Sequence, residues 1–205
     1  MGKDKKLNAE QKIIEAAADI FETKGFEGAR MQQIADKAGI NKALLHYYFR
    51  SKDLLFEKVF LKLAGKIFLK FIETFNIEGS IFDKIEMFLQ IHQDLLYKNR
   101  KFPIFFFNEI TRNPDLMRKL MLNLEISKKF QEITKQFDQE KKDGIIRQDV
   151  EVSHLIVNII SLSVFPYIGS PAIKEIMKEF DLNYEQFLDE RRTMIAQFVI
   201  NSIKV

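Results

Sequence analysis

Residues that can bind an anion are concentrated in the segment GINKALLHYYFRSKDLL, which runs from Gly39 to Leu55. Basic residues and two tyrosines alternate there with apolar residues, and no acidic residue precedes Asp53. Ammonium, guanidinium and imidazole groups donate hydrogen bonds to phosphate oxygens, and a tyrosine hydroxyl does so while its ring packs on apolar surface. The chemistry that this segment can carry is therefore the binding of an anionic partner.

The net positive charge of the chain lies in its first quarter. Residues 1–52 hold ten of the 32 Lys and Arg and seven of the 29 Asp and Glu, so the remainder holds 22 of each (32 minus 10, 29 minus 7). Within 29–52 there are five basic residues and one acidic residue. A local basic patch on an otherwise neutral chain indicates one specific anionic partner rather than general stickiness.

Two short helices are needed to position these residues. The first is expected over 29–38 and the second over 42–48, with Gly39 at the turn, because glycine adopts positive φ without steric cost. Asn41 can cap the second helix, and Ser51 can cap the long helix that follows. Two short helices joined by a tight turn are typical of the helix-turn-helix, whose second helix enters the major groove of DNA. The alternative is an ordinary helical hairpin in a bundle.

The pattern of the whole chain predicts an all-α fold. Apolar positions recur at intervals of three and four, no β-type alternation is sustained, and the 205 residues include only 8 Gly and 4 Pro. Besides the two short helices, we expect helices over about 8–24, 52–75, 81–98, 103–111, 115–142, 151–167 and 183–203, about nine in all. Residues 1–50 are then a small helix-turn-helix domain, and residues 51–205 a larger helical bundle.

Enzymes and metal proteins are poorly matched by this sequence. The chain has no cysteine, which excludes a disulfide framework, a thiolate zinc site and a cysteine nucleophile. A Gly-rich phosphate loop, G-x-S-x-G and H-E-x-x-H are missing, and the three histidines are widely separated. We therefore expect no enzyme, no metal and no cofactor. No apolar run approaches the roughly 18 residues of a membrane span, and the N-terminus lacks a signal core, so a cytoplasmic protein is expected.

Four motifs near the N-terminus occur in a familiar order. They are Ala17-Phe21 (A-x-x-x-F), Gly25-Phe26, the run from Ile34 to Ile40 (IADKAGI) and the run from Phe49 to Leu55 (FRSKDLL). The segment that contains them resembles the N-terminal domain of the TetR family of bacterial transcriptional regulators, continuously over about 50 residues. It departs from the family at Arg30, Ala43 and His46, where Ser or Thr, Gly and Tyr are frequent.

The resemblance implies a function as well as a fold. TetR-like regulators bind a partly palindromic double-stranded DNA operator as a homodimer, most often as repressors. The remainder of the chain, 51–205, would then be the effector-binding and dimerisation domain, and a small hydrophobic or aromatic effector would release the DNA. The alternative is a helical ligand-binding or protein-interaction module whose helix-turn-helix does not regulate DNA.

Ten residues are predicted to meet DNA. They are Arg30, Gln32, Gln33, Lys42, Ala43, Leu44, His46, Tyr47, Tyr48 and Lys52. Lys42 can reach the backbone, and Ala43 and Leu44 can approach thymine methyl groups. His46 can donate to a base acceptor or a phosphate, or can instead be a packed histidine. Lys52 is included because the resemblance places it at a position associated with backbone contact.

Residues for the effector pocket and the dimer interface are drawn from the second part of the chain. The 17 Phe that follow residue 55 can form both core and pocket walls. The candidate effector residues are His92, Tyr97, Phe106, Asn108 and Asn158. The candidate interface residues are Leu155, Ile159, Phe187, Ile195 and Phe198, on the last two expected helices. The alternative for these two helices is that they only close the core of the monomer.

Overall fold

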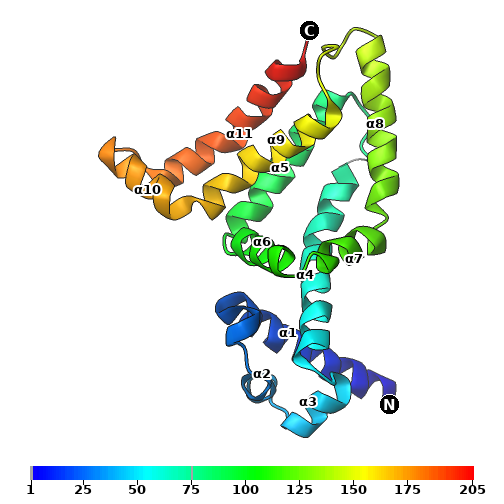
Figure 1. Cartoon of the computed structure of the whole chain (residues 1–205), viewed down its shortest axis with the longest axis vertical. Coiled ribbons are helices and arrows are strands. Elements are labelled where there is room, and N and C mark those ends of the chain that lie inside the picture. The colour runs from blue at the N-terminus through cyan, green and yellow to red at the C-terminus, as the bar shows by residue number, and fades with distance from the viewer. Residues whose placement is uncertain (1, 75) are drawn as a thin grey trace. The chain divides into compact units, whose positions relative to one another are not determined.

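The computed structural model describes residues 2–74 and 76–205, with side chains from residue 9 onward. Within this part of the chain there are eleven α-helices and no β-strand, which confirms the all-α prediction (Figure 1). They are α1 (Gly2–Gly28), α2 (Met31–Ala38), α3 (Lys42–Tyr48), α4 (Lys52–Thr74), α5 (Ile81–Lys98), α6 (Phe102–Arg112), α7 (Asp115–Asn123), α8 (Ile126–Lys142), α9 (Val152–Ile168), α10 (Ser170–Glu179) and α11 (Tyr184–Ile203). The predicted end of the fourth helix, Phe75, lies outside the described residues.

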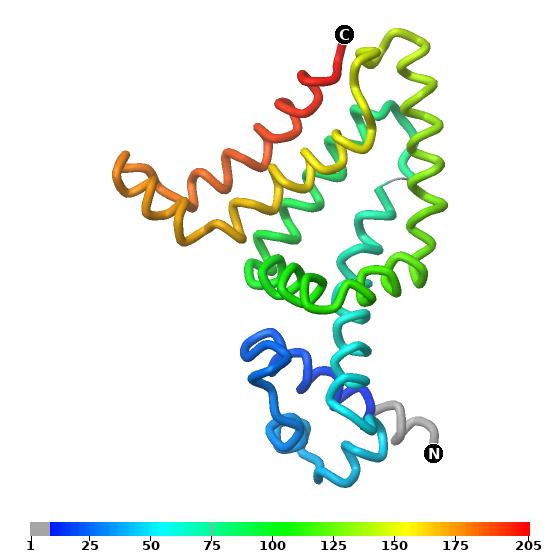
Figure 2. Tube along the Cα trace, viewed as in Figure 1, coloured from blue at the N-terminus to red at the C-terminus, as the bar shows by residue number. Residues whose placement is uncertain are grey.

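The expected number of about nine helices was too low. The stretch expected as one helix over 115–142 is two, because Glu125 adopts a left-handed φ of 50° between α7 and α8. α10 was not expected at all, although Pro171 lies in its first turn, where the missing N–H of proline does no harm. Figure 2 shows how α10 joins α9 to α11.

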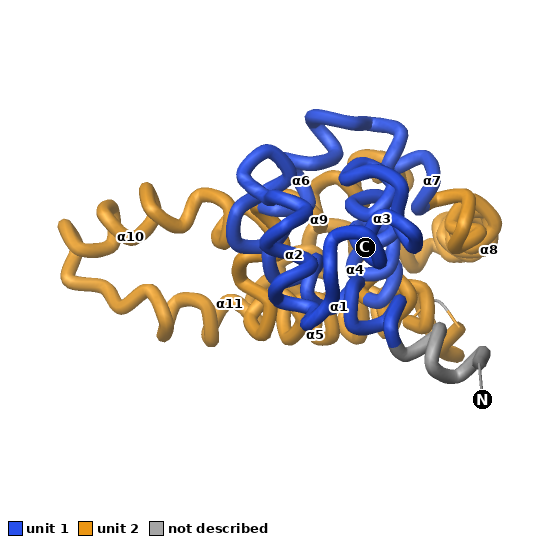
Figure 3. The backbone as a smooth tube through the Cα atoms, turned by 90° about the horizontal axis from the view of Figure 1, so that it is seen from below, with its two compact units in different colours: residues 1–66, 105–120 blue, residues 67–104, 121–205 orange. Residues whose placement is uncertain are grey.

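The chain divides into two compact units, which are coloured separately in Figure 3. Unit 1 contains α1 to α3, α4 as far as Lys66, and residues 105–120. Unit 2 contains residues 67–104 and 121–205. This division differs from the expected one at residue 50, because the first part of α4 and most of α6 pack their rings into unit 1.

Phenylalanine rings form much of the interior of unit 1. Phe56 on α4 makes edge-on contacts with Phe21 and Phe26, with ring centroids 4.8 and 5.1 Å apart. Further along α4, Phe60 stacks on Phe106 of α6 with centroids 5.5 Å apart. Such pairs add about 0.5–1.5 kcal/mol each beyond the burial of their surface. α1, α4 and α6 are thereby held together around one aromatic core.

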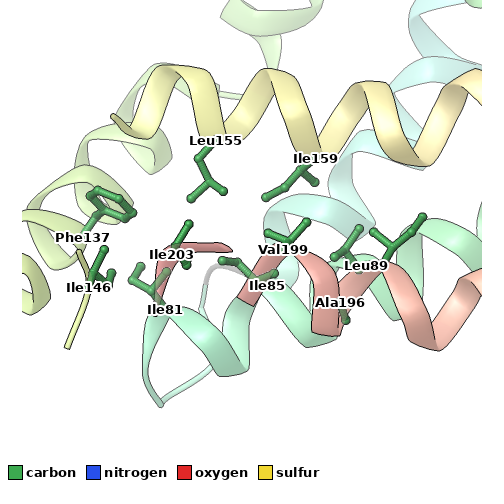
Figure 4. Packing of buried hydrophobic residues seen from close by; sticks show 11 residues of the cluster. Ile81, Ile85, Leu89, Phe137, Ile146, Leu155, Ile159, Ala196, Val199 and Ile203 are labelled. Carbon is green, nitrogen blue, oxygen red and sulfur yellow. The ribbon is translucent and has the colours of Figure 1, made fainter. Parts of the chain in front are cut away.

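The core of unit 2 is aliphatic and follows the helical repeat. α5 contributes Ile81, Ile85 and Leu89, and α11 contributes Ile195, Val199 and Ile203, one residue per turn in each case (Figure 4). Leu155 and Ile159 of α9, with Phe137 of α8 and the loop residue Ile146, complete the cluster. Each fully buried side chain of this size stabilises the fold by about 1.5–3 kcal/mol.

A proline inside α9 creates a carbonyl that the helix cannot satisfy. Pro166 has no N–H, so the carbonyl of Leu162, four residues earlier, lacks its usual helical donor. Arg191 of α11 supplies the missing donors, with Nη2 and Nε at 3.0 and 3.3 Å from the Leu162 oxygen. This contact ties α11 to α9 at the position where α9 would otherwise be weakest.

No single helix among the described residues is long and apolar enough to cross a membrane. α9 and α10 meet the length and composition criteria only as a pair, and they are bent by 75° at the break between them. The described residues also contain no group of three His, Asp or Glu side chains that could hold a metal ion.

Candidate nucleic-acid interface

The turn between α2 and α3 is built by Gly39. Its φ of 68° lies in the left-handed region that favours glycine. The N–H of Ile40 donates to the Ala35 carbonyl at 3.0 Å, and the N–H of Gly39 donates to the Asp36 carbonyl at 3.1 Å. This pair of bonds is the Schellman motif, which satisfies the last carbonyls of a helix. The predicted helix end at Gly39 is confirmed.

Polar caps fix the starts of the two following helices. The Asn41 side chain accepts a hydrogen bond from the Leu44 N–H at 2.8 Å, and Ser51 Oγ accepts one from the Leu54 N–H at 3.2 Å. Each cap satisfies a backbone donor that the helix cannot, which typically stabilises the fold by about 1 kcal/mol. Both predicted caps are confirmed, and α3, which begins after Asn41, is a short helix of seven residues.

α3 has one buried side and one exposed side. Leu45 is fully buried, together with Ile34 and Ala35 of α2, whereas Leu44 and Tyr47 remain 37% and 69% exposed. Lys42, Ala43 and His46 are also exposed. We call Lys42, Ala43, Leu44, His46 and Tyr47 the α3 face. Large apolar groups rimmed by polar ones in this way mark a surface that meets a partner.

The positive charge of Lys42 on the α3 face has no acidic partner in the described part of the chain. Among the described residues, Lys42 has no carboxylate within ion-pair distance, and neither does Arg50, which was not on the predicted list and is also exposed. Lys37, by contrast, is paired with Asp19. Tyr48 is half-buried and its ring meets that of Tyr47 edge-on, with centroids 5.5 Å apart. The two adjacent rings thus hold each other beside the unpaired cations.

The three predicted residues of α2 and its N-cap differ in their freedom to meet DNA. Arg30 is the N-cap residue of α2 and is exposed. Gln32 is exposed, but its amide already donates to Asp36 at 2.7 Å. Gln33 is half-buried, and its Oε1 has no hydrogen-bond partner among the described residues. Of the three, Arg30 is therefore the most available for a contact with DNA.

Lys52 has a role that the sequence did not suggest. Its Nζ donates to the carbonyls of Phe26 and Ala29, at 2.9 and 3.2 Å, and lies 4.3 Å from the centroid of the Phe26 ring. An ammonium group has three donors, so one remains for a phosphate. The predicted DNA contact of Lys52 stays a prediction, while its contact with the segment before α2 is plain. No local sequence signal points to this contact, since its partners lie more than twenty residues earlier.

Comparison with known proteins decides the family. Residues 13–59 match the family model described as bacterial regulatory proteins, tetR family. The chain is 28% identical over 177 residues to the HTH-type transcriptional regulator YttP of Bacillus subtilis (strain 168), which covers 84% of this chain and 83% of that protein. Residues 13–59 are therefore the helix-turn-helix segment of a TetR-family transcriptional regulator. Proteins of this family bind DNA and usually act as dimers, and they are generally not enzymes.

Two further matches agree with this assignment. The regulator is 36% identical over 94 residues to the HTH-type transcriptional regulator RutR of Escherichia coli (strain K12), with 44% of each chain covered. The fold matches the crystal structure of a transcriptional regulator from Streptomyces coelicolor with a TM-score of 0.69 and 19% identity, over 94% of this chain and 97% of that one. This last likeness concerns the fold alone.

The predicted effector residues lie in different surroundings. His92 is only 5% exposed and its ring lies between those of Phe71 and Phe88, with centroid distances of 4.7 and 5.2 Å. Its Nδ1 has no hydrogen-bond partner among the described residues, and burial lowers its pKa to about 4. Tyr97, also on α5, is partly exposed and lies under the guanidinium of Arg100, 4.2 Å from its ring centroid.

None of the other three candidates combines burial with an unsatisfied polar atom. Phe106 is buried in unit 1 by its stacking on Phe60. Asn108 on α6 and Asn158 on α9 are both exposed. Of the five predicted residues, only His92 is a buried polar side chain with an unsatisfied atom.

Three of the five predicted interface residues are buried within the chain itself. Leu155, Ile159 and Ile195 lie in the core of unit 2, and Figure 4 shows the first two. Phe187 is half-buried, and Phe198 is 64% exposed. α9 is apolar on nearly every side, so its sequence does not tell which side packs inward, and the interface role of these five residues stays a prediction.

The exposed apolar residues of α9 and α11 are different ones. α9 exposes Val157, Ile160 and Phe165, and α11 exposes Met194 and Phe198. We call these five residues the α9 and α11 faces. Val157 and Ile160 are three residues apart and share one side of α9, and Met194 and Phe198 are four residues apart and share one side of α11.

Proposed function

We propose that this TetR-family regulator binds a partly palindromic operator as a homodimer through its α3 face, and that a small hydrophobic effector releases it, so that it acts as a repressor. The observation that carries the proposal is the α3 face itself, where an unpaired cation and exposed rings lie on a short, firmly capped helix. A helix that faces only solvent has no need of large rings, and a helix buried in a protein core has no place for an unpaired cation.

Each residue of the α3 face has a role in this proposal. Lys42 neutralises a backbone phosphate, which makes the affinity depend on salt. Ala43 is small enough to let the helix approach base edges, and Leu44 packs on thymine methyl groups. His46 donates to a base acceptor or a phosphate, and Tyr47 donates its hydroxyl to a phosphate. Contacts to phosphate position the helix, and contacts to bases select the sequence.

The α9 and α11 faces support the homodimer. α9 contains no Lys, Arg, Asp or Glu from Val152 to Ile168, and α11 contains none from Thr193 to Ile203. Depletion of charge with large apolar side chains is characteristic of the centre of an interface between subunits. A dimer would present two α3 helices to the two halves of a palindrome, whose half-sites lie about 34–36 Å or a multiple apart. We also propose that the regulator is a cytoplasmic protein, as expected from the sequence.

The surroundings of His92 support an effector site. An unsatisfied buried polar atom costs about 1–3 kcal/mol, and an effector that hydrogen-bonds to Nδ1 would recover part of that cost. The rings of Phe71 and Phe88 suit an apolar or aromatic body. Release then follows from linkage. An effector that binds a conformation with misaligned α3 helices more tightly than the DNA-binding conformation weakens DNA binding, and the ratio of its affinities for the two conformations limits the effect. α4 runs without interruption from Lys52 to Thr74 and is the natural carrier of such a change.

Footprinting on the DNA that flanks the regulator's own gene tests the proposal. We expect a protected region with approximate two-fold symmetry, and loss of protection in the presence of one member of a panel of small hydrophobic compounds. Lys98→Ala, which changes an exposed lysine on α5, serves as the control variant and should leave the footprint unchanged. Absence of any protection at low salt would instead favour a helical binding module that does not regulate DNA.

A further inference from the structure

Two cations from different helices lie against the same ring in unit 1. The guanidinium of Arg112, at the end of α6, is 4.0 Å from the centroid of the Phe26 ring and 5.4 Å from that of Phe56. The ammonium of Lys52, at the start of α4, is 4.3 Å from the same Phe26 centroid. Phe26 itself is buried and lies just before α2 in the chain.

We propose that Arg112 and Lys52 clamp Phe26 and thereby fix the direction in which α2 and α3 leave α1, which makes Arg112 a positioning residue for DNA binding. The inference rests on the proposed DNA-binding function and extends it to α6, a helix far from the helix-turn-helix in sequence. Arg112 does not touch DNA in this proposal. It acts through the ring of Phe26.

Arg112 is itself held in a fixed orientation. Its Nε donates to Glu109 Oε2 at 2.9 Å, its Nη2 forms an ion pair with the same oxygen at 2.8 Å, and Glu109 is only 5% exposed. A guanidinium group that pairs along its edge still offers its flat face to an aromatic ring. The ion pair therefore fixes the position of the guanidinium, whose flat face lies against the ring of Phe26.

The balance of charge explains why two cations can share one ring. Glu109 neutralises Arg112, and the carbonyls of Phe26 and Ala29 take the place of water around the Lys52 ammonium. Without these acceptors, two like charges so close to one ring would repel each other and their desolvation would be costly. The arrangement thus depends on partners from α1, α4 and α6 at once.

The segment clamped in this way is a joint in the backbone. Gly25 breaks the helical path of α1 with a φ of 67°, and Arg30 is extended, with φ −118° and ψ 135°. The Ala29 N–H donates to the Phe26 carbonyl at 3.3 Å, just beyond the end of α1. A small rotation here turns α2 and α3 together, since the Schellman turn and the Asn41 cap keep those two helices in one arrangement.

Arg112→Met tests the inference against a matched control. Arg118→Met removes an arginine that also pairs with an acidic residue three positions earlier, Asp115, and that is exposed on α7. We expect Arg112→Met to weaken binding to the footprinted DNA by about tenfold, because each of two subunits loses its cation–π contact with Phe26. Arg118→Met should change the affinity by less than about twofold. An Arg112→Met protein that is folded and binds as tightly as the wild type overturns the inference.

A double-mutant cycle with Phe26→Leu separates positioning from general loss of stability. If Arg112 acts through the ring, the double variant binds DNA no more weakly than the worse of the two single variants. Losses that multiply would show independent effects and would overturn the proposal. Arg112→Met can fail to fold because it leaves the Glu109 carboxylate buried without its partner. In that case the double variant Glu109→Gln, Arg112→Met removes that charge and replaces Arg112→Met in the cycle.

Hydrogen exchange gives a readout that does not need DNA. The amide of Ala29 should exchange faster in Arg112→Met than in the wild type, and Arg118→Met should leave it unchanged. Unchanged exchange at Ala29 in Arg112→Met counts against the clamp even if no operator is found. Failure of the wild type to protect any DNA, by contrast, would remove the proposed function while leaving the exchange result to stand alone.

Discussion

The α3 face and the α9 and α11 faces both expose large apolar side chains, but they differ in charge. On α3, Leu44 and Tyr47 alternate with Lys42 and His46, and no acidic residue lies between Gly39 and Asp53. On α9 and the second half of α11, Val157, Phe165 and Phe198 are exposed where no charged residue occurs. In the proposed function both regions are interaction sites, and the charge distinguishes the class of partner. The cationic face fits a polyanion, and the uncharged faces fit a second copy of the chain.

The largest effect is expected from a charge placed on the uncharged faces. Phe198→Glu should raise the dimer dissociation constant by at least about 100-fold, because the substitution occurs twice in a two-fold symmetric interface and buries two carboxylates. Sedimentation at micromolar concentration should then show a monomer. Leu122→Glu on α7 is the matched control, since Leu122 is 66% exposed and Phe198 64%. A Phe198→Glu protein that remains a dimer would place the interface elsewhere.

A second prediction extends the comparison to the histidines. His46 lies exposed on the α3 face, whereas His92 is buried in unit 2, and burial lowers the pKa of His92 from 6.5 to about 4. The unfolded chain therefore binds a proton near pH 6.5 that the folded chain binds only near pH 4. This group leaves stability unchanged above pH 6.5 and removes about 3 kcal/mol as the pH falls from 6.5 to 4.

Urea unfolding at fixed protein concentration between pH 7 and pH 4 measures this loss. The wild type should lose more stability over that range than His92→Gln, which has no titrating group at this position. His154→Gln, which changes an exposed histidine of α9, is the control and should follow the wild type. Parallel curves for the wild type and His92→Gln would show that His92 is not the buried neutral group described above.

The third prediction concerns salt. Lys42→Ala should weaken DNA binding on all sequences and reduce the slope of log affinity against log salt by about one unit per subunit, because each lysine releases one condensed counterion. A fluorescence titration at several salt concentrations measures the slope, with Lys98→Ala as control. The dimer dissociation constant should hardly depend on salt, since the α9 and α11 faces carry no charge. An unchanged slope for Lys42→Ala would remove this residue from the phosphate contacts.

The features that the sequence predicted correctly are those set by near neighbours in the chain. The turn at Gly39 and the caps at Asn41 and Ser51 depend on residues within four positions, and all three are confirmed. The clamp of Lys52 and Arg112 on Phe26, and the bond from Arg191 to the Leu162 carbonyl, join residues far apart in sequence. No local pattern announces such contacts, because they depend on how the helices pack.

The side of α9 that packs inward could not be predicted for a different reason. Ile159 is buried and Ile160 is exposed, although the two residues are identical and adjacent. Hydrophobic periodicity assigns a buried side only when the opposite side is polar, and α9 has no charged residue to mark one. The same lack of charge that concealed the orientation of α9 is what now points to a subunit interface.

The smallest effect, from Tyr47→Phe, tests how much of the α3 face acts through polar contacts. The substitution removes the hydroxyl and keeps the ring, which is 69% exposed and meets Tyr48 edge-on. If the hydroxyl donates to a phosphate, binding should weaken by about two- to tenfold with little change in the salt slope, because a neutral donor releases no counterion. Tyr47→Ala, which also removes the ring, should weaken binding further in the same titration. Equal affinity for Tyr47→Phe and the wild type, with a clear loss for Tyr47→Ala, would mean that Tyr47 meets DNA through its ring alone. At this position the α3 face would then bind its partner through apolar contact, as the α9 and α11 faces are proposed to do, and not through charge as at Lys42.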